Sequence, residues 1–139
     1  HISVGATFDL LETSSGRVIL TFQKEKERKR RLERRKFYKK FESASKIPSK
    51  QLKDIEKKFS NNSMQKIIKD GYELVKSLQI KGVTNISVPL FDYTGSAIAA
   101  LTIPFVDRII SKGEPKLEEV KNLLKNSGKR ISSDMGYKK

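Results

Sequence analysis

The chain has 139 residues, enough for one domain that buries a hydrophobic core without support from disulfides or metals. It contains no cysteine, and its single histidine is His1, so a thiol nucleophile and a metal site built from Cys and His ligands are excluded. The 30 Lys and Arg residues against 16 Asp and Glu residues give a formal net charge of +14, which favours anionic partners. The longest apolar stretch, residues 97–105, is too short to span a membrane, so we expect a cytoplasmic protein. Because the chain lacks Cys and has no His beyond His1, we also expect that it is not an enzyme and has no cofactor.

The first elements that the sequence predicts are a short strand at residues 2–4 and a helix within residues 10–22. In the second segment, LLETSSGRVILTF, the small polar residues from Thr13 to Gly16 lead into apolar residues at helical spacing, which predicts that the helix begins at this step. The first turn of such a helix has free backbone N–H groups and a partial positive charge. It can therefore bind an anion or a carbonyl oxygen, and simple N-capping is the alternative.

Half of the net charge lies in residues 24–42, which hold 11 Lys and Arg residues and 4 Glu residues, a net of +7. The few apolar residues of this segment fall near helical spacing, so we predict a helix that lies on the domain by a narrow stripe. These apolar residues are Leu32, Phe37, Tyr38 and Phe41. Two interpretations remain open, a solvated surface helix and a module that binds nucleic acid without sequence preference. The second would use Arg30, Arg31, Arg34 and Arg35.

Two shorter helices are predicted from capping and stop signals. Ser49 can cap a helix that ends at residues 60–62, Ser-Asn-Asn. Ser63 can then cap a short helix that ends at Gly71, a residue type that commonly follows the last helical turn. Both helices carry apolar residues on one face, so we expect them to pack on the core.

Residues 82–104 predict one β-hairpin, because two apolar runs flank the turn-forming residues Asp92 to Gly95. With a four-residue loop, Phe91 opposes Ser96. One face then forms the core and pairs Ile86 with Leu101, Val88 with Ala99 and Leu90 with Ala97. The other face holds small and weakly polar side chains, which suit either a small cavity or a face half open to water. These are Asn85, Ser87, Pro89, Ile98, Ala100, Thr102 and Pro104.

A closing amphipathic helix follows the hairpin. We expect Pro115 in its first turn and an interruption at Gly128 near its middle. Its apolar residues are Leu117, Val120, Leu123, Leu124 and Ile131. The order of strand, helices, hairpin and closing helix predicts an α+β fold, an antiparallel sheet flanked by helices.

Five features, taken in this order, match one known family. They are the helix start Ser14-Ser15-Gly16-Arg17, the pair Gly71-Tyr72, the run Val88 to Asp92 with Gly95, the strand Ala99 to Ile103, and the segment Ile131 to Gly136. The chain thereby resembles the C-terminal effector-binding domain of the IclR family of transcription regulators. The resemblance implies a GAF-like or profilin-like fold. It also implies that a small organic effector of the carboxylate type binds between the sheet and a helix N-terminus.

The resemblance further implies a set of ligand contacts. In this family the helix start closes one end of the effector cavity through backbone amides, and the polar face of the hairpin forms the opposite wall. Carried over by position, the contacts are Ser15, Gly16, Val75, Asn85, Thr102 and Pro104. Val75 stands where the family commonly has a carboxylate, and Pro104 stands where members can carry a small hydroxyl residue. Fewer acceptors favour a ligand with less donor capacity, or a pocket that has drifted from sensing.

Partners are implied in the same way. Family members bind DNA through an N-terminal winged helix-turn-helix domain, which nothing in this chain resembles, and they work as dimers or tetramers. We therefore expect residues 1–139 to be a single sensor domain, a fragment of a longer regulator that associates with itself and contacts DNA through a domain absent from this chain. A nucleic-acid-binding module that uses the helix at 24–42 and a purely structural oligomerisation domain are the alternatives.

Overall fold

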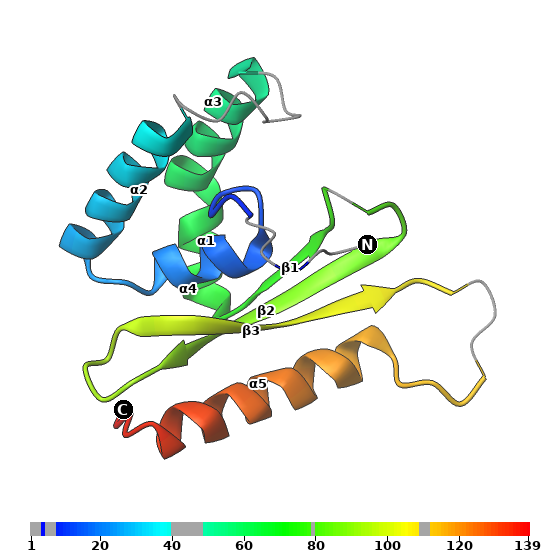
Figure 1. Cartoon of the computed structure of the whole chain (residues 1–139). Helices are drawn as coiled ribbons and strands as arrows, with labels where there is room; N and C mark the ends of the chain where they lie inside the picture. The colour runs from blue at the N-terminus through cyan, green and yellow to red at the C-terminus, as the bar shows by residue number, and fades with distance from the viewer. Residues whose placement is uncertain (1–3, 5–7, 40–48, 79, 109–111) are drawn as a thin grey trace.

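The computed structural model describes residues 4, 8–39, 49–78, 80–108 and 112–139 (Figure 1). At its centre is an antiparallel sheet of three strands in the order β1-β2-β3. The strands are β1 (Glu73–Lys76), β2 (Val83–Phe91) and β3 (Ala97–Val106). β2 and β3 form a long hairpin, and β1 pairs with the first half of β2. Within the described residues, β1 and β3 are therefore the edges of the sheet.

One face of the sheet is covered by the long closing helix α5 (Leu117–Asp134), which runs along β2 and β3 (Figure 1). Ile86 and Val88 of β2 are buried against this helix, which supplies Val120 and Leu124. These two helix residues are one turn apart and so share a side of α5. The main hydrophobic core therefore lies between α5 and the sheet.

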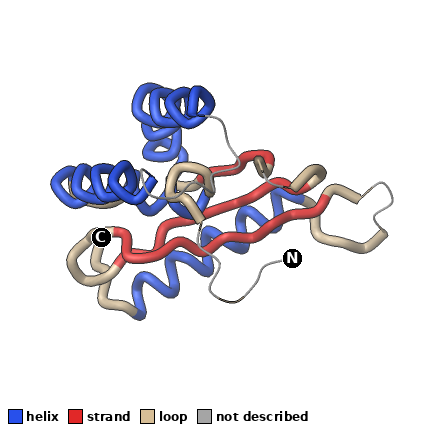
Figure 2. The backbone as a smooth tube through the Cα atoms, turned by 45° about the horizontal axis from the view of Figure 1, so that its top comes forward, coloured by secondary structure: helices blue, strands red, loops and turns tan. Residues whose placement is uncertain are grey.

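The opposite face of the sheet carries α1 (Ser14–Thr21), and the remaining helices stack on α1 (Figures 1 and 2). α2 (Glu25–Lys39) and α3 (Ser49–Lys58) lie side by side, and α3 continues through a π-helical turn (Phe59–Ser63) into α4 (Met64–Asp70). A second core cluster joins α1 to these helices. It consists of Leu11, Leu20 and Phe59, with Leu10, Leu32, Ile55 and Met64 packed around them.

The hairpin is confirmed, but its register differs from the expected one. Phe91 pairs with Ala97, so the loop has five residues instead of four. A bulge at the end of β2 shifts the remaining pairs by two residues, and Leu101 faces Val88 instead of Ile86. Because side chains alternate with a period of two, an even shift leaves every residue on its expected face. The apolar face is core, as predicted.

The helices differ from the sequence-based expectation at four points. No helix stop occurs at residues 60–62, because the π-helical turn carries the chain from α3 into α4. Ser63 is helical and makes no side-chain capping bond. Pro115 precedes Lys116, the N-cap of α5, instead of lying in the first turn, and α5 runs without interruption through Gly128.

The predicted helix start near Thr13 and the predicted helix end at Gly71 are both confirmed. Thr13 is the N-cap of α1, and Gly71 ends α4 in the left-handed conformation, with φ at 78°. The strand expected at residues 2–4 lies outside the described residues except for Val4, which is in an exposed turn. Residues 40–42 of the expected basic helix also lie outside them. None of the described helices is long and apolar enough to cross a bilayer.

Candidate ligand-binding site

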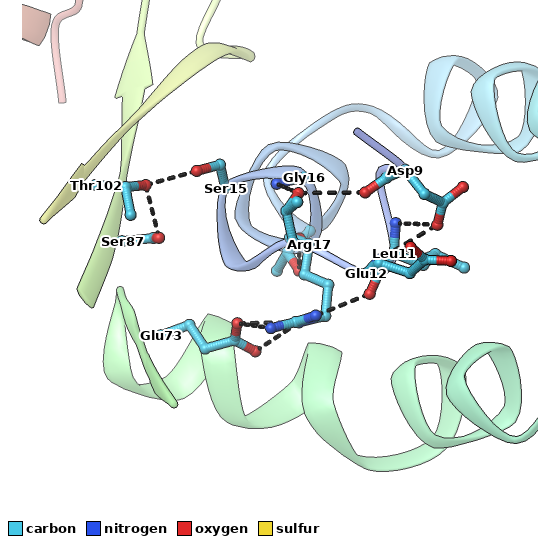
Figure 3. Close-up of polar contacts among 11 residues, drawn as sticks. Asp9, Leu11, Glu12, Ser15, Gly16, Arg17, Glu73, Ser87 and Thr102 are labelled. Carbon is cyan, nitrogen blue, oxygen red and sulfur yellow. Dashed lines mark hydrogen bonds and ion pairs between the residues drawn. The ribbon is translucent and has the colours of Figure 1, made fainter. Parts of the chain in front are cut away.

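The start of α1 is held in place by a tight turn (Figure 3). Asp9 Oδ1 accepts a hydrogen bond from the backbone N–H of Leu11 at 3.0 Å. The Thr13 hydroxyl accepts the N–H of Gly16 at 3.1 Å, so the Gly16 amide is used within the protein and is not free for a ligand. The missing side chain of Gly16 serves packing instead, because a Cβ there would lie 2.0 Å from the carbonyl oxygen of Leu10.

Three of the residues expected to contact a ligand form one row across the sheet. Val75 of β1 pairs with Asn85 of β2, and Asn85 pairs on its other side with Pro104 of β3. Residues directly opposite each other in antiparallel strands point to the same face. Since the same face carries Ser87 and Thr102, which α1 contacts, this row lies on the α1 side of the sheet.

The neighbouring row of the sheet is tied to α1 by hydroxyl groups. Thr102 Oγ1 lies 2.6 Å from Ser15 Oγ and 2.8 Å from Ser87 Oγ (Figure 3). Ser87 is fully buried, so these contacts satisfy a hydroxyl that has no access to water. The chain of three hydroxyls fixes the first turn of α1 to β2 and β3.

A buried ion pair is a further contact that fixes α1 on the sheet. The Arg17 guanidinium donates to Glu73 Oε1 at 2.7 and 2.9 Å and to Glu73 Oε2 at 3.1 Å (Figure 3). It also donates to the backbone oxygen of Leu11 at 2.8 Å. The two charged side chains are only 10% and 11% exposed. Glu73 pairs with Ser87, two residues before Val75, so it supplies a carboxylate on the α1 face where Val75 does not. Arg17 binds that carboxylate.

A recess of about 180 Å³ opens beside these contacts, between the start of α1 and the end of β1. Ser14 is one of the lining residues, and its hydroxyl oxygen is buried and has no hydrogen-bond partner among the described residues. Lys76, which is exposed, adds a positive charge to the lining. The rest of the lining is Phe8, Glu12, Thr13, Ser15, Arg17, Ser77, Leu78, Asn85 and Thr102.

The recess brings together three of the six expected ligand residues, Ser15, Asn85 and Thr102. Val75 and Pro104 share a row with Asn85 but do not line the recess. Gly16 does not line it either, and packs against the backbone of Leu10. Ser14 belongs to the helix start that the sequence indicates as a possible anion site, although the resemblance does not place it among the ligand contacts. Lys76 was not predicted as a lining residue. The pairing of Arg17 with Glu73 was not predicted either, because the partners are 56 positions apart and no spacing in the sequence signals it.

Comparison with known proteins identifies the family. A family model described as "Bacterial transcriptional regulator IclR C-terminal" matches residues 1–133. The chain belongs to this family. The IclR resemblance of the sequence is thereby confirmed, and so is the α+β, GAF-like fold. No curated protein sequence matches the chain.

Three solved structures superpose on most of the chain. The C-terminal domain of the E. coli transcriptional regulator KdgR is 27% identical, with a TM-score of 0.62, over 92% of this chain and 71% of that one. The Thermotoga maritima IclR is 27% identical, with a TM-score of 0.61, over 98% and 53%. Pseudomonas aeruginosa HmgR shares the fold at 23% identity and a TM-score of 0.67, over 98% and 49%. The chain thus spans about half the length of the last two proteins.

A larger hollow of about 540 Å³ lies elsewhere on this IclR domain, between α5 and the end of α1. Phe22, Val88 and Phe91 give it a largely apolar wall, and Lys125 and Lys129 stand among its lining residues. None of the six expected ligand residues lines it. Of the two hollows, the smaller recess is therefore the one that matches the expected site.

Proposed function

We propose that the chain is the ligand-sensing domain of an IclR-family transcription regulator, and that a small organic carboxylate binds in the recess at the start of α1. The buried, unpartnered Ser14 hydroxyl carries this proposal, because an unsatisfied buried polar group is costly and a ligand oxygen would satisfy it. The positive end of the α1 dipole and the Lys76 ammonium favour a negatively charged ligand at the same place. Asn85 adds an amide to the wall.

The size of the recess limits the ligand. A volume of about 180 Å³ equals that of about six water molecules at ~30 Å³ each, which suits an acid of a few carbon atoms. A ligand in this position contacts both α1 and the sheet, and so stabilises their packing. Because α1 also packs against the other helices, a shift of α1 on ligand binding would change their positions as well.

Thermal unfolding with a panel of carboxylates of two to six carbons tests this proposal. At a hundredfold excess over Kd, a ligand adds about 2.7 kcal/mol, which raises the Tm of a domain of this size by about 9 °C. Ser14→Ala should leave the Tm of the free protein unchanged or slightly higher, because it removes an unsatisfied hydroxyl. The same variant should bind the acid about 10- to 100-fold more weakly, since it loses a hydrogen bond to a charged group.

Two further variants locate the site. Lys76→Gln should weaken binding, whereas Lys129→Gln, a matched loss of charge at the larger hollow, should not. If the ligand response survives Ser14→Ala and Lys76→Gln but is lost in Lys129→Gln, the effector binds in the larger hollow and the assignment to the recess is wrong.

We also propose that the chain associates with itself and belongs to a longer regulator whose DNA-reading domain lies outside residues 1–139. The outer edge of β3 supports the first part, because within the described residues no strand pairs with it and an unpaired strand edge tends to find a partner. Its first residue, Ala97, is already covered, by backbone contact with Phe22 and by the Gln23 side chain. The partner surface should lie away from α2, whose like charges would face each other across a two-fold axis.

Sedimentation at physiological salt tests the association. We expect a dimer or tetramer at tens of micromolar, and we expect Val106→Lys on β3 to weaken it, because Val106 is 56% exposed at the end of this edge strand. Leu123→Lys, a matched change of an exposed apolar residue on α5, should have no effect. A monomer at this concentration would refute self-association of the chain.

A further inference from the structure

α2 and α3, which lie side by side (Figure 1), carry a strong concentration of positive charge, and neither helix lines the recess at the start of α1. α2 has nine Lys and Arg residues against three Glu residues, and α3 has four Lys residues against Asp54 and Glu56. The acidic residues at the start of α2 are already paired. Lys29 contacts Glu25 at 2.8 Å and holds the pKa of that carboxyl below its usual value, and Arg30 contacts Glu27 at 3.1 Å. The net charge that remains is positive.

Arg35 differs from the other cations of α2 because it is buried. Its side chain is 6% exposed, and its guanidinium contacts Asp9 at 2.6 Å and Glu56 at 2.7 Å. Arg35 therefore joins α2 to α3 and to the turn before α1, and it does not offer its charge to an external partner. Arg30, Arg31 and Arg34, the other arginines of the nucleic-acid interpretation, are exposed.

Between α2 and α3 lies a groove of about 300 Å³ lined by three lysines, Lys36, Lys53 and Lys57. Lys53 and Lys57 are one turn apart and so lie on one side of α3, while Lys36 comes from α2. The groove has one acidic lining residue, Glu56, and Arg35 already binds its carboxylate. None of the three lysines is paired with a carboxylate among the described residues. The other lining residues are Leu11, Leu32, Phe59 and Ser60.

We propose that this lysine groove binds the phosphate backbone of duplex DNA and so gives the regulator a DNA contact within its C-terminal domain. The groove borders α2, a helix of 15 residues and about 22 Å that also carries the exposed cations Arg30, Arg31 and Arg34. A surface of this length matches a repeating polyanion better than a single small anion, since duplex DNA carries one charge per about 1.7 Å of its axis. Transcription regulation, the family's role, brings such a polyanion within reach. The contact is independent of the ligand recess.

The salt dependence of binding to a short duplex of arbitrary sequence tests this proposal on the 139-residue chain. Each phosphate that a lysine neutralises contributes about 0.9 to the slope of log K against log salt concentration. The triple variant Lys36→Gln, Lys53→Gln and Lys57→Gln should therefore lower the slope by about 2 to 3, and should bind about tenfold or more weakly at low salt. Fluorescence anisotropy between about 50 and 200 mM salt measures both quantities.

A second triple variant provides the matched control. Lys81→Gln, Lys112→Gln and Lys138→Gln removes the same charge from exposed positions outside α2 and α3, and its slope should stay that of the unchanged protein. Circular dichroism checks that both variants fold. Equal losses in the two variants would mean general charge attraction and would overturn the proposal. So would the absence of duplex binding at low salt, or tighter binding to the single strand than to the duplex.

Discussion

Replacing Gly16 by alanine is expected to destabilise the protein by about 3 kcal/mol, the upper end of the usual range for overpacking. The new Cβ would lie 2.0 Å from the carbonyl oxygen of Leu10 and 2.6 Å from its Cα. These are backbone atoms, so no rotamer change relieves the clash. The turn that would have to move carries Leu11, a residue of the second core cluster and a partner of Arg17. Thermal unfolding should show a Tm lower by about 10 °C.

Gly128→Ala is the matched control for this change. There a Cβ would lie 2.8 Å from Val88 Cγ2, the end of a side chain that can shift, so we expect a smaller loss than at Gly16. If Gly16→Ala lowered the stability no more than Gly128→Ala, this result would contradict the close packing of α1 on the turn that precedes it. The expected result also shows that a Gly16 variant cannot test ligand binding, because it disturbs the fold whether or not a ligand binds beside it.

The two faces of the hairpin could be predicted from the sequence, whereas its register could not. Alternation along β2 assigns Ile86 and Val88 to one face and Asn85 and Ser87 to the other, whatever the exact pairing. The register depends on a five-residue loop and a bulge near Phe91, and turn-forming residues allow loops of either length. The pattern therefore indicated what each face is made of and left the pairing two residues in error.

The continuation of α3 into α4 shows where local signals are overridden. Ser60, Asn61 and Asn62 are typical of a helix stop, but the structure keeps them helical as a π turn. Phe59 at the start of that turn is buried in the second core cluster, and Met64 just after it packs on the same cluster. Because Phe59 and Met64 pack on the same core, the chain stays helical through three poor helix formers. The extra residue of the π turn changes the direction in which the following side chains of α4 point.

The candidate site was predictable only in part, because it too depends on contacts between residues that are far apart in the sequence. The family resemblance directed attention to Ser15, Asn85 and Thr102, and the structure places all three at one recess. The position of α1 beside this recess depends on side-chain contacts between distant parts of the chain. Arg17 and Glu73 carry opposite charges, but the sequence offers each of them many other partners, and only the fold pairs them.

Breaking the ion pair between Arg17 and Glu73 is the second change expected to lower the stability of the protein strongly. Glu73→Gln keeps the shape of the side chain but leaves the Arg17 guanidinium buried without a counter-charge, and we expect a loss of about 3 kcal/mol. Asp70→Asn is the control, because Asp70 pairs with Lys66, whose side chain is 78% exposed, and solvent-exposed ion pairs add little to stability. Chemical denaturation of the two variants measures the difference.

A double variant separates the charge from the packing. Arg17→Met combined with Glu73→Leu removes both buried charges and fills the same space with apolar groups, so it should be more stable than Glu73→Gln alone. The ion pair then acts mainly by fixing where α1 sits on β1, and the double variant should bind a carboxylate less well even though it is folded. If Glu73→Gln cost no more than Asp70→Asn, the pair would not hold α1 in place, and the hydroxyl chain from Ser15 to Thr102 would be left as the main polar contact between α1 and the sheet.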